Sequence, residues 1–331
     1  MEAPARKDPW HRNRLIRDGI YMAIAEEMAA RPEIYLMGEG SHMKVHFDAP
    51  GIERDFPGRC LTLPISEDGN ANFAVGASLA GVVPIVDVIS SDFLYRCMDG
   101  ICNTMAKAEA VGRARTMVVR AEFLTGGPTS GQRIEALFAH IPGLHVYVPS
   151  SPRDAYALMM VALGREGVTV FFEDRMIADS EIPDEEKLAS DTPSSDLLGS
   201  LWRARVFGGK RRASPKVTVA SYGIAFRRCW DLLRDDDDCN LVDLRSLYPL
   251  DVERVIGCVD DGALLVVEPD VRFLGIGAEL VAEICERRPG TRVMRLGAPR
   301  KTIPASAALH HLMLPSDVEI LSAVRKLKEP A

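Results

Sequence analysis

One carboxylate stands out in the stretch LTLPISEDGNANFAVGASLAG, residues 61–81. An apolar run ends at Pro64, Glu67 follows, and the segment after it is almost wholly small and apolar. A strand that leads into such a helix would hold this carboxyl group rigidly and partly out of water, so that it keeps a proton more readily. Glu67 is therefore a candidate for proton transfer. Its alternative role is that of a helix N-terminal carboxylate that interacts with the helix dipole.

The segments around Glu67 predict an alternation of strands and helices. Apolar runs predict strands, and amphipathic or small-residue periods predict helices. The predicted strands cover 33–40, 82–90, 114–123, 145–150 and 168–174, and the predicted helices cover 13–31, 72–80, 97–111 and 151–164. This alternation is typical of an α/β domain with a mostly parallel sheet and helices on both of its faces.

The pattern breaks once and then resumes. Residues 179–215 are polar and rich in Pro, Gly and Ser, which predicts a linker with a short ordered piece at LWRARVF. From residue 216 strands and helices alternate again. We therefore expect two α/β domains, over 12–178 and 216–331, joined by this linker.

Composition narrows the class of protein. The 331 residues are long for one core, and 47% hydrophobic with 26% charged residues is an ordinary globular balance. A net charge of -7 and a pI near 5.6 argue against nucleic acid or an anionic membrane as partner. The apolar stretches are too short to span a bilayer, and the polar N-terminus predicts no secretory signal. Seven cysteines without a CxxC pair favour reduced thiols in the cytoplasm over disulfides or a metal site.

A nucleotide-binding site is the usual hypothesis for such a fold, and the sequence argues against it. FLGIGAELVAE contains only two of the glycines of a dinucleotide fingerprint, Gly275 and Gly277. These glycines predict a tight turn with close helix packing instead. The chain has no P-loop, HExxH or GxSxG motif.

The order of several blocks resembles one family over nearly the whole chain, from about residue 12 to 328. EIYLMGEG, PISEDGNANFAVGASLAG, DFLYRCMDGICNTMAKAEA and EALFAHIPGLHVYVPSSPRDAYALM are followed by VTVASYG, VDLRSLYPLD, LLVVEPD, GIGAEL and LPSDVEIL. This series is similar to the β subunit of the thiamine diphosphate-dependent E1 component of 2-oxoacid dehydrogenases, of the pyruvate, branched-chain and acetoin types. The resemblance implies a transketolase-like pyrimidine-binding domain followed by a transketolase C-terminal domain.

The resemblance implies roles for three side chains. Glu67, in PISE, would contact N1′ of the aminopyrimidine and move the proton that lets thiamine diphosphate become a nucleophile. Phe93 would stack on the aminopyrimidine ring, and its alternative is a core phenylalanine. Glu39, in MGEG, would lie in a loop near the cofactor, or be an ordinary loop carboxylate.

A missing motif implies a partner. Thiamine diphosphate enzymes hold the diphosphate through Mg²⁺ with a GDG motif, and this chain contains no GDG. The resemblance implies that a separate α subunit carries it, that the cofactor lies between α and β, and that β–β contacts complete an α₂β₂ heterotetramer. The chain itself would bind no metal, and a lipoyl-bearing E2 is a possible further partner.

The second departure concerns a histidine. The family commonly has HSQ where this chain has Ser130-Gly131-Gln132, so Ser130 stands at the histidine's position. His42 and His46, after MGEG, are candidates to replace it, or surface histidines. The expected activity is decarboxylation of a 2-oxo acid. Transfer to a lipoyl arm, carboligation or another acyl transfer, and a non-catalytic partner subunit remain open.

Overall fold

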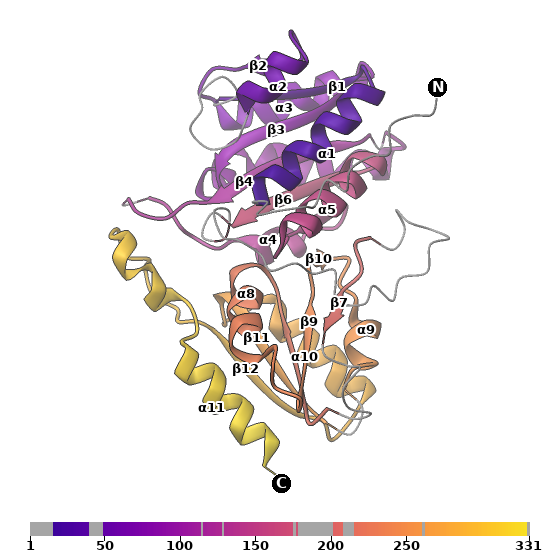
Figure 1. The fold of residues 1–331 in the computed structure, drawn as a ribbon. Coiled ribbons are helices and arrows are strands. Elements are labelled where there is room, and N and C mark those ends of the chain that lie inside the picture. The colour runs from indigo at the N-terminus through magenta and orange to yellow at the C-terminus, as the bar shows by residue number, and fades with distance from the viewer. Residues whose placement is uncertain are drawn as a thin grey trace, which may run out of the picture.

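The computed structural model describes residues 16–39, 49–113, 115–127, 129–174, 177, 201–207, 215–259 and 262–329. Within these residues the chain forms two α/β layers stacked end to end (Figure 1). The N-terminal sheet and its helices lie at one end, and the C-terminal sheet with helix α11 (Asp317–Lys328) lies at the other. The predicted α/β class is confirmed.

The first sheet has seven strands within the described part of the chain. Their order is β10-β5-β6-β4-β3-β1-β2, and all pairs are parallel except β10 with β5. The bounds are β1 (Ile34–Gly38), β2 (Cys60–Thr62), β3 (Val83–Ser90), β4 (Met117–Phe123), β5 (Leu144–Tyr147), β6 (Val168–Asp174) and β10 (Ser246–Tyr248). The central strands are buried on both faces, which explains their continuous apolar runs.

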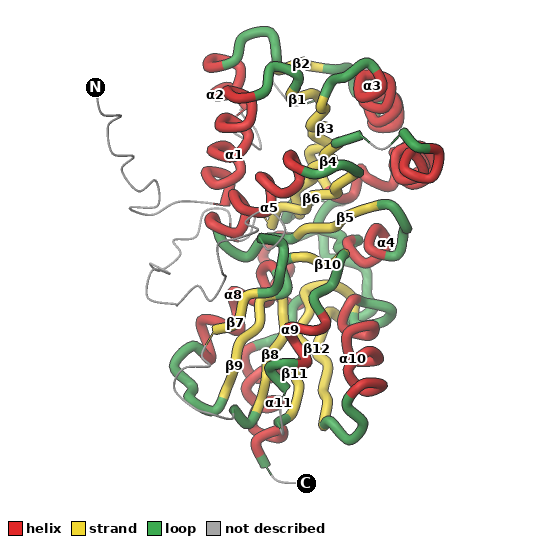
Figure 2. Tube along the Cα trace, turned by 90° about the vertical axis from the view of Figure 1, so that its right-hand side faces the viewer, coloured by secondary structure: helices red, strands yellow, loops and turns green. Residues whose placement is uncertain are grey.

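Helices cover both faces of this sheet. On one face α1 (Ile16–Ala30), α2 (Ala49–Asp55) and α5 (Pro152–Gly164) pack against the strands, with α1 and α5 in mutual contact. On the other face lie α3 (Glu67–Leu79), the short helices η1 (Ser91–Cys97), η2 (Gly100–Met105) and η3 (Ala106–Val111), and α4 (Glu135–Ala139). Figure 2 shows α3 and α1 on opposite sides of the strands.

The second sheet has five strands among the described residues, in the order β12-β11-β8-β9-β7. The bounds are β7 (Arg205–Phe207), β8 (Val217–Ser221), β9 (Cys239–Asp243), β11 (Ala263–Val271) and β12 (Arg292–Ala298). Helices α8 (Gly223–Leu233) and α11 cover one face, and α9 (Val252–Ile256) and α10 (Ile276–Arg287) cover the other. A final short helix, η5 (Ala307–Met313), precedes α11.

Two strands cross the boundaries expected from sequence. β7 lies inside the predicted linker and pairs antiparallel with β9 of the second sheet. β10, from the C-terminal half, is the antiparallel edge strand of the first sheet. The C-terminal half therefore contributes an edge strand to the first sheet, and one core cluster runs across both layers.

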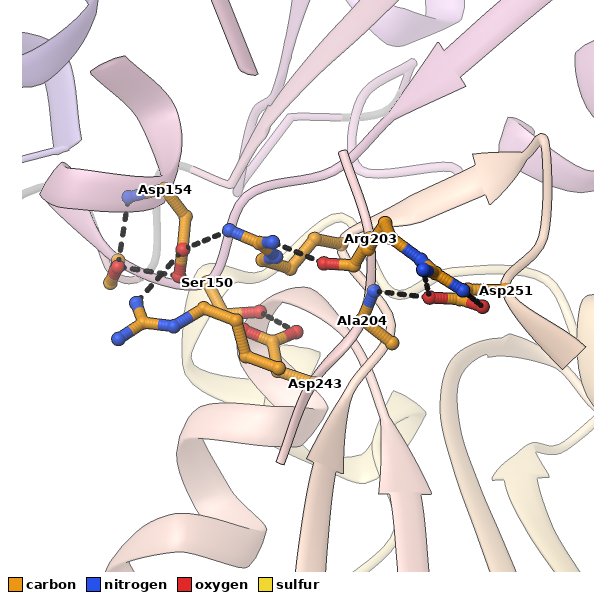
Figure 3. A network of polar contacts seen from close by, with 9 residues as sticks. Ser150, Asp154, Arg203, Ala204, Asp243 and Asp251 are labelled. Atoms are coloured by element: carbon orange, nitrogen blue, oxygen red, sulfur yellow. Dashed lines mark hydrogen bonds and ion pairs between the residues drawn. The ribbon is translucent and has the colours of Figure 1, made fainter. Parts of the chain in front are cut away.

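A buried polar network fixes this junction (Figure 3). Asp154, at the start of α5, accepts hydrogen bonds from Arg205 at 3.0 Å and from Arg245 at 2.6 Å. Burial alone would raise the pKa of Asp154, but the two guanidinium groups lower it to about 2. Nearby, Ser150 donates to Asp243 at 2.8 Å. The network ties the first layer to β7 and β9, so the domains are held in one relative position.

The predicted helix at 97–111 is wrong in detail. The segment is a π-helical piece followed by a 3-10 piece, η2 and η3, and a 3-10 turn, η1, precedes it. Its backbone packs closely against α3, because a Cβ on Gly100 would lie 3.1 Å from the Cβ of Ala71. Tertiary packing of this kind outweighs the regular helical period.

Candidate active site

Glu67 is the first residue of α3, at the end of the turn that follows β2. Its side chain is 8% exposed, although it stands at a helix start beside solvent. The Nε of Arg96, from η1, donates to its Oε2 at 3.1 Å, and the Arg96 side chain is itself 73% exposed. No described residue donates to the other carboxylate oxygen. The arrangement leaves Glu67 rigid and able to accept a hydrogen bond from a ligand.

Glu39 fixes the turn that presents Glu67. Its Oε1 accepts a hydrogen bond from the backbone N–H of Ser66 at 2.9 Å and one from the Asn70 amide at 3.3 Å. Burial raises the pKa of Glu39, the bond from Ser66 opposes this, and the nearby charge of Glu67 adds to the rise. The structure therefore places Glu39 and Glu67 at the same turn.

Gly69 lies close to Ser66 in this turn. A Cβ on Gly69 would lie 2.6 Å from the hydroxyl oxygen of Ser66, so a larger residue at position 69 would require the exposed Ser66 side chain to rotate away.

Helix η1 supplies the next side chains. Phe93 is half-buried, and its side chain packs against the core. Asp92, beside it, accepts from the backbone N–H groups of Gly131 at 2.9 Å and Gln132 at 3.3 Å. Burial raises the pKa of Asp92, while these hydrogen bonds oppose the rise. One short helix therefore links the neighbourhood of Glu67 to the loop that carries Ser130.

That loop is where the sequence lacks a histidine. The Ser130 hydroxyl donates to the carbonyl of Gly126, so it closes the loop on itself. Gln132 is exposed. His42 and His46 lie outside the described residues. His140 is the exposed C-cap residue of α4.

A cluster of buried charged side chains on β3, β4 and β6 lies next to the site. Arg120 of β4 is 1% exposed; it donates to Glu173 of β6 at 2.5 and 2.7 Å and to Asp87 of β3 at 3.1 Å. Asp87 also accepts from the N–H of Ile89, whose φ of 67° is unusual for a β-branched residue. Ile89 comes just before η1, so this cluster positions the helix that carries Phe93 and Arg96.

Sequence reasoning missed Arg96, Asp92 and Arg120. A signal for the cluster existed, because VPIVDVIS, MVVRAEF and VFFED each place one or two charged residues in a mostly apolar strand. Buried charges of this kind need partners. Nothing local marked Arg96 as a contact of Glu67.

The predicted turn at Gly275 and Gly277 is confirmed. The N–H of Gly277 donates to Glu268 at 2.9 Å, and a Cβ on Gly275 would lie 2.4 Å from the same carboxylate. A side-chain carboxylate thus occupies the helix N-terminus where a dinucleotide would place its phosphates.

A cavity of about 90 Å³ lies between the two layers, beside the Ser130 loop. Its lining is mostly apolar and comes from the end of β4, from β11 and β12, and from η5. Its polar walls are Thr125, Gln132, Arg133, Lys301 and His310. Within the described residues, no group of acidic, histidine or cysteine side chains could hold a metal ion, and no helix is long and apolar enough to cross a membrane.

The fold and the site together define a class of protein, which has two α/β layers and a shielded carboxylate at the start of a helix. Residues 13–179 match the model of the transketolase pyrimidine-binding domain, and residues 208–320 match the transketolase C-terminal domain. The chain therefore belongs to the transketolase pyrimidine-binding domain family, whose members use thiamine diphosphate.

Similar proteins are E1 β subunits. A pyruvate dehydrogenase E1 β subunit of Rickettsia bellii is 28% identical and covers 94% of this chain and 98% of its own. A 2-oxoisovalerate dehydrogenase β subunit of Bacillus subtilis is 27% identical with 94% and 98% coverage, and an acetoin oxidoreductase β subunit of Cupriavidus necator is 27% identical with 94% and 96%. A split-gene transketolase structure has the same fold, with a TM-score of 0.75 at 21% identity over 96% of this chain and 99% of its own.

Proposed function

We propose that this chain is the β subunit of a thiamine diphosphate-dependent enzyme that decarboxylates a 2-oxo acid. The observation that carries the proposal is Glu67, shielded at the start of α3 with one carboxylate oxygen unused by the described residues. Such a carboxylate fits an aminopyrimidine, which offers a ring nitrogen able to carry a proton. The E1 β relatives support the reaction class.

Each residue then has a defined task. Thiamine diphosphate, when bound, supplies the carbon centre that stabilises the charge left by decarboxylation. Glu67 holds and moves the proton at N1′ of the aminopyrimidine. Phe93 offers its ring for stacking, and Glu39 keeps the turn through Ser66 in one conformation. Together they orient the pyrimidine half of the cofactor.

The diphosphate half requires an α subunit. The sequence has no GDG motif, so we assign the Mg²⁺ and diphosphate site to the partner. Large apolar side chains stand exposed in the Glu67 turn and on the helices next to it, including Ile65 at 85%, Phe73 and Leu79 along α3, and Tyr95 of η1. An apolar face of this kind next to half a site supports a partner there. We propose a cytoplasmic α₂β₂ assembly, with a lipoyl-bearing E2 as the acceptor protein.

A second candidate is carboligation or a related acyl transfer. It is favoured by Ser130, because a hydroxyl bound to the Gly126 carbonyl does not titrate near neutral pH. A carbonyl acceptor needs less acid–base help than a lipoyl arm. A non-catalytic role is disfavoured by the ordered Glu67 turn.

Reconstitution tests the proposal. The chain alone should show no Mg²⁺-dependent calorimetric binding of thiamine diphosphate in the micromolar range, and addition of the α subunit should create it. The pair should then release CO₂ from at least one of pyruvate, the branched-chain 2-oxo acids and their close analogues. Tight Mg²⁺-dependent binding by the isolated chain would contradict the shared site, and an inactive but cofactor-loaded pair would contradict the reaction.

A further inference from the structure

The Ser130 loop is in contact with a segment from the far end of the chain. The N–H of Gly127 donates to the carbonyl of Ala305 at 2.8 Å, and a Cβ on Gly126 would lie 3.4 Å from the Cβ of Ala307. In Figure 1 the golden segment that precedes α11 reaches up to this loop after β4. The C-terminal layer therefore contributes a wall to the loop.

That wall carries a histidine. His310, of η5, is 7% exposed and lies directly on Gly131: a Cβ on Gly131 would be 2.6 Å from the imidazole Cε1 and 3.2 Å from Nδ1. Gly131 has φ of +95°, so glycine both permits this backbone and leaves room for the ring. The imidazole thus sits against the residue next to Ser130, where the family has its histidine.

Contacts define which ring nitrogen is available. Nε2 lies 3.0 Å from the carbonyl of Pro304 and 3.4 Å from the N–H of Gly126. The two contacts need opposite roles of Nε2, a donor toward the carbonyl and an acceptor from the N–H. We assign the proton to Nε2 on the shorter contact, and in that tautomer the contact with Gly126 is not a hydrogen bond. Nδ1 then carries the lone pair, and no described residue bonds to it. A ring anchored through one nitrogen with the other unused is arranged to exchange a proton with a ligand.

The cavity between the two layers is where such a ligand would bind. His310 lines it together with Gln132, Arg133 and Lys301. Arg133 forms an ion pair with Asp174. Lys301 lies in the loop after β12. A substrate or acceptor that enters between the layers therefore meets the imidazole beside the Lys301 side chain and the ion pair of Arg133 with Asp174.

We propose that His310 does the acid–base work that Ser130 cannot do. This inference rests on the proposed function. In the transfer half of the reaction, the carbon that has lost CO₂ forms a bond either to an acceptor carbonyl carbon, whose C=O π bond breaks, or to one sulfur of a lipoyl disulfide, whose S–S bond breaks. With the disulfide, the two sulfurs are reduced and the transferred carbon is oxidised to the acyl level. Nδ1 of the protonated ring gives its proton to the oxygen or sulfur that receives the electron pair. The bond between the transferred group and the cofactor then breaks, its electron pair stays with the cofactor, and solvent returns a proton to the ring. His310 is not needed for proton movement at N1′, which belongs to Glu67.

The first test separates the two halves of the reaction. His310→Gln keeps a donor for the Pro304 carbonyl and removes the imidazole. The reconstituted enzyme should still release a first equivalent of CO₂ per site, while steady-state transfer falls by about 10²–10⁴-fold. His311→Gln is the matched control, because His311 is the exposed neighbour of His310 and its imidazole contacts the Ala308 carbonyl within its own short helix. Steady-state transfer by His310→Gln within about threefold of wild type would overturn the inference.

The second test excludes a structural role. Adding Ser130→His to His310→Gln places an imidazole on the other side of Gly131. At least tenfold recovery of transfer supports the inference, since a packing defect would not be repaired at a different position. No recovery in a double variant that keeps the wild-type melting temperature would count against it.

The third test needs no variant and no turnover. Hydrogen exchange at imidazole Cε1, followed by mass spectrometry in the wild-type α–β complex, reports access to each histidine. A non-decarboxylating 2-oxo acid analogue should slow exchange at His310 and leave His311 unchanged. Unchanged exchange at His310 with the analogue bound would overturn the inference. The proposed function fails on a different result, a CO₂ burst that survives in Glu67→Gln, so the two failures are distinguishable.

Discussion

Replacing Arg120 by Met should reveal how strongly the ion cluster under the site stabilises the fold. The guanidinium is 1% exposed and makes three hydrogen bonds to two carboxylates, Glu173 and Asp87, which are themselves buried. Methionine fills a similar volume but leaves both carboxylates without their cation. Removing one partner of such a buried set costs about 3–5 kcal/mol. The whole free energy of unfolding of a domain is about 5–15 kcal/mol, so the loss should be large.

The variant should also respond to pH. Burial raises the pKa of Glu173, and in the native chain Arg120 opposes that rise. Without the guanidinium the folded state holds extra protons, so stability falls as the pH rises. The deficit of Arg120→Met should therefore be greatest at neutral pH and smaller near pH 5.

Urea unfolding followed by far-UV circular dichroism at both pH values measures these effects. The matched control is Arg228→Met, because the pair of Arg228 with Asp317 lies at the surface. It should change the free energy of unfolding by less than about 1 kcal/mol. A loss below about 1 kcal/mol for Arg120→Met at pH 7, equal to that of the control, would refute the reasoning.

Two further predictions concern the ring and a buried carboxyl group. Phe93→Leu should keep the fold and weaken cofactor binding by the α–β pair roughly three- to tenfold, because stacking contributes about 1 kcal/mol beyond burial. Calorimetry measures this affinity, and an unchanged affinity would mean that Phe93 is only a core residue. Burial raises the pKa of Glu268 to about 7 against hydrogen bonds from Gly277 and Arg295, so the folded state keeps a proton that the unfolded state loses. The contribution of Glu268 to the free energy of unfolding should therefore fall by about 3 kcal/mol as the pH rises from 4.5 to 7. Glu268→Gln should flatten that dependence in thermal unfolding across this range, and an identical pH profile would contradict the assignment.

Local sequence patterns predicted most of the fold. The apolar runs at 82–90 and 168–174 became β3 and β6, and the small-residue run after Glu67 became α3. These elements are set by periodicity and burial, which a single sequence displays. β7 and β10 were harder, since their antiparallel partners lie in other parts of the chain. Strand pairing between distant segments leaves no mark in the local pattern.

The residues of the candidate site could likewise be predicted only in part. Glu67, Phe93 and Glu39 stood in recognisable blocks, and the structure brings Glu67 and Glu39 together through Ser66. His310 could not be found beforehand, because it reaches the Ser130 loop across the boundary between the layers. LHHLM near the end of the chain gives no sign of contact with SGQ. Such contacts depend on how two domains pack.

Turnover by Glu67→Gln tests the central claim most directly. The amide is nearly isosteric and cannot move a proton, whereas Asp68→Asn changes the exposed neighbour in the same helical turn. In the reconstituted α–β enzyme, with far-UV circular dichroism unchanged, CO₂ release by Glu67→Gln should fall by about 10²–10⁴-fold while Asp68→Asn stays near wild type. Near wild-type release by Glu67→Gln would contradict the account.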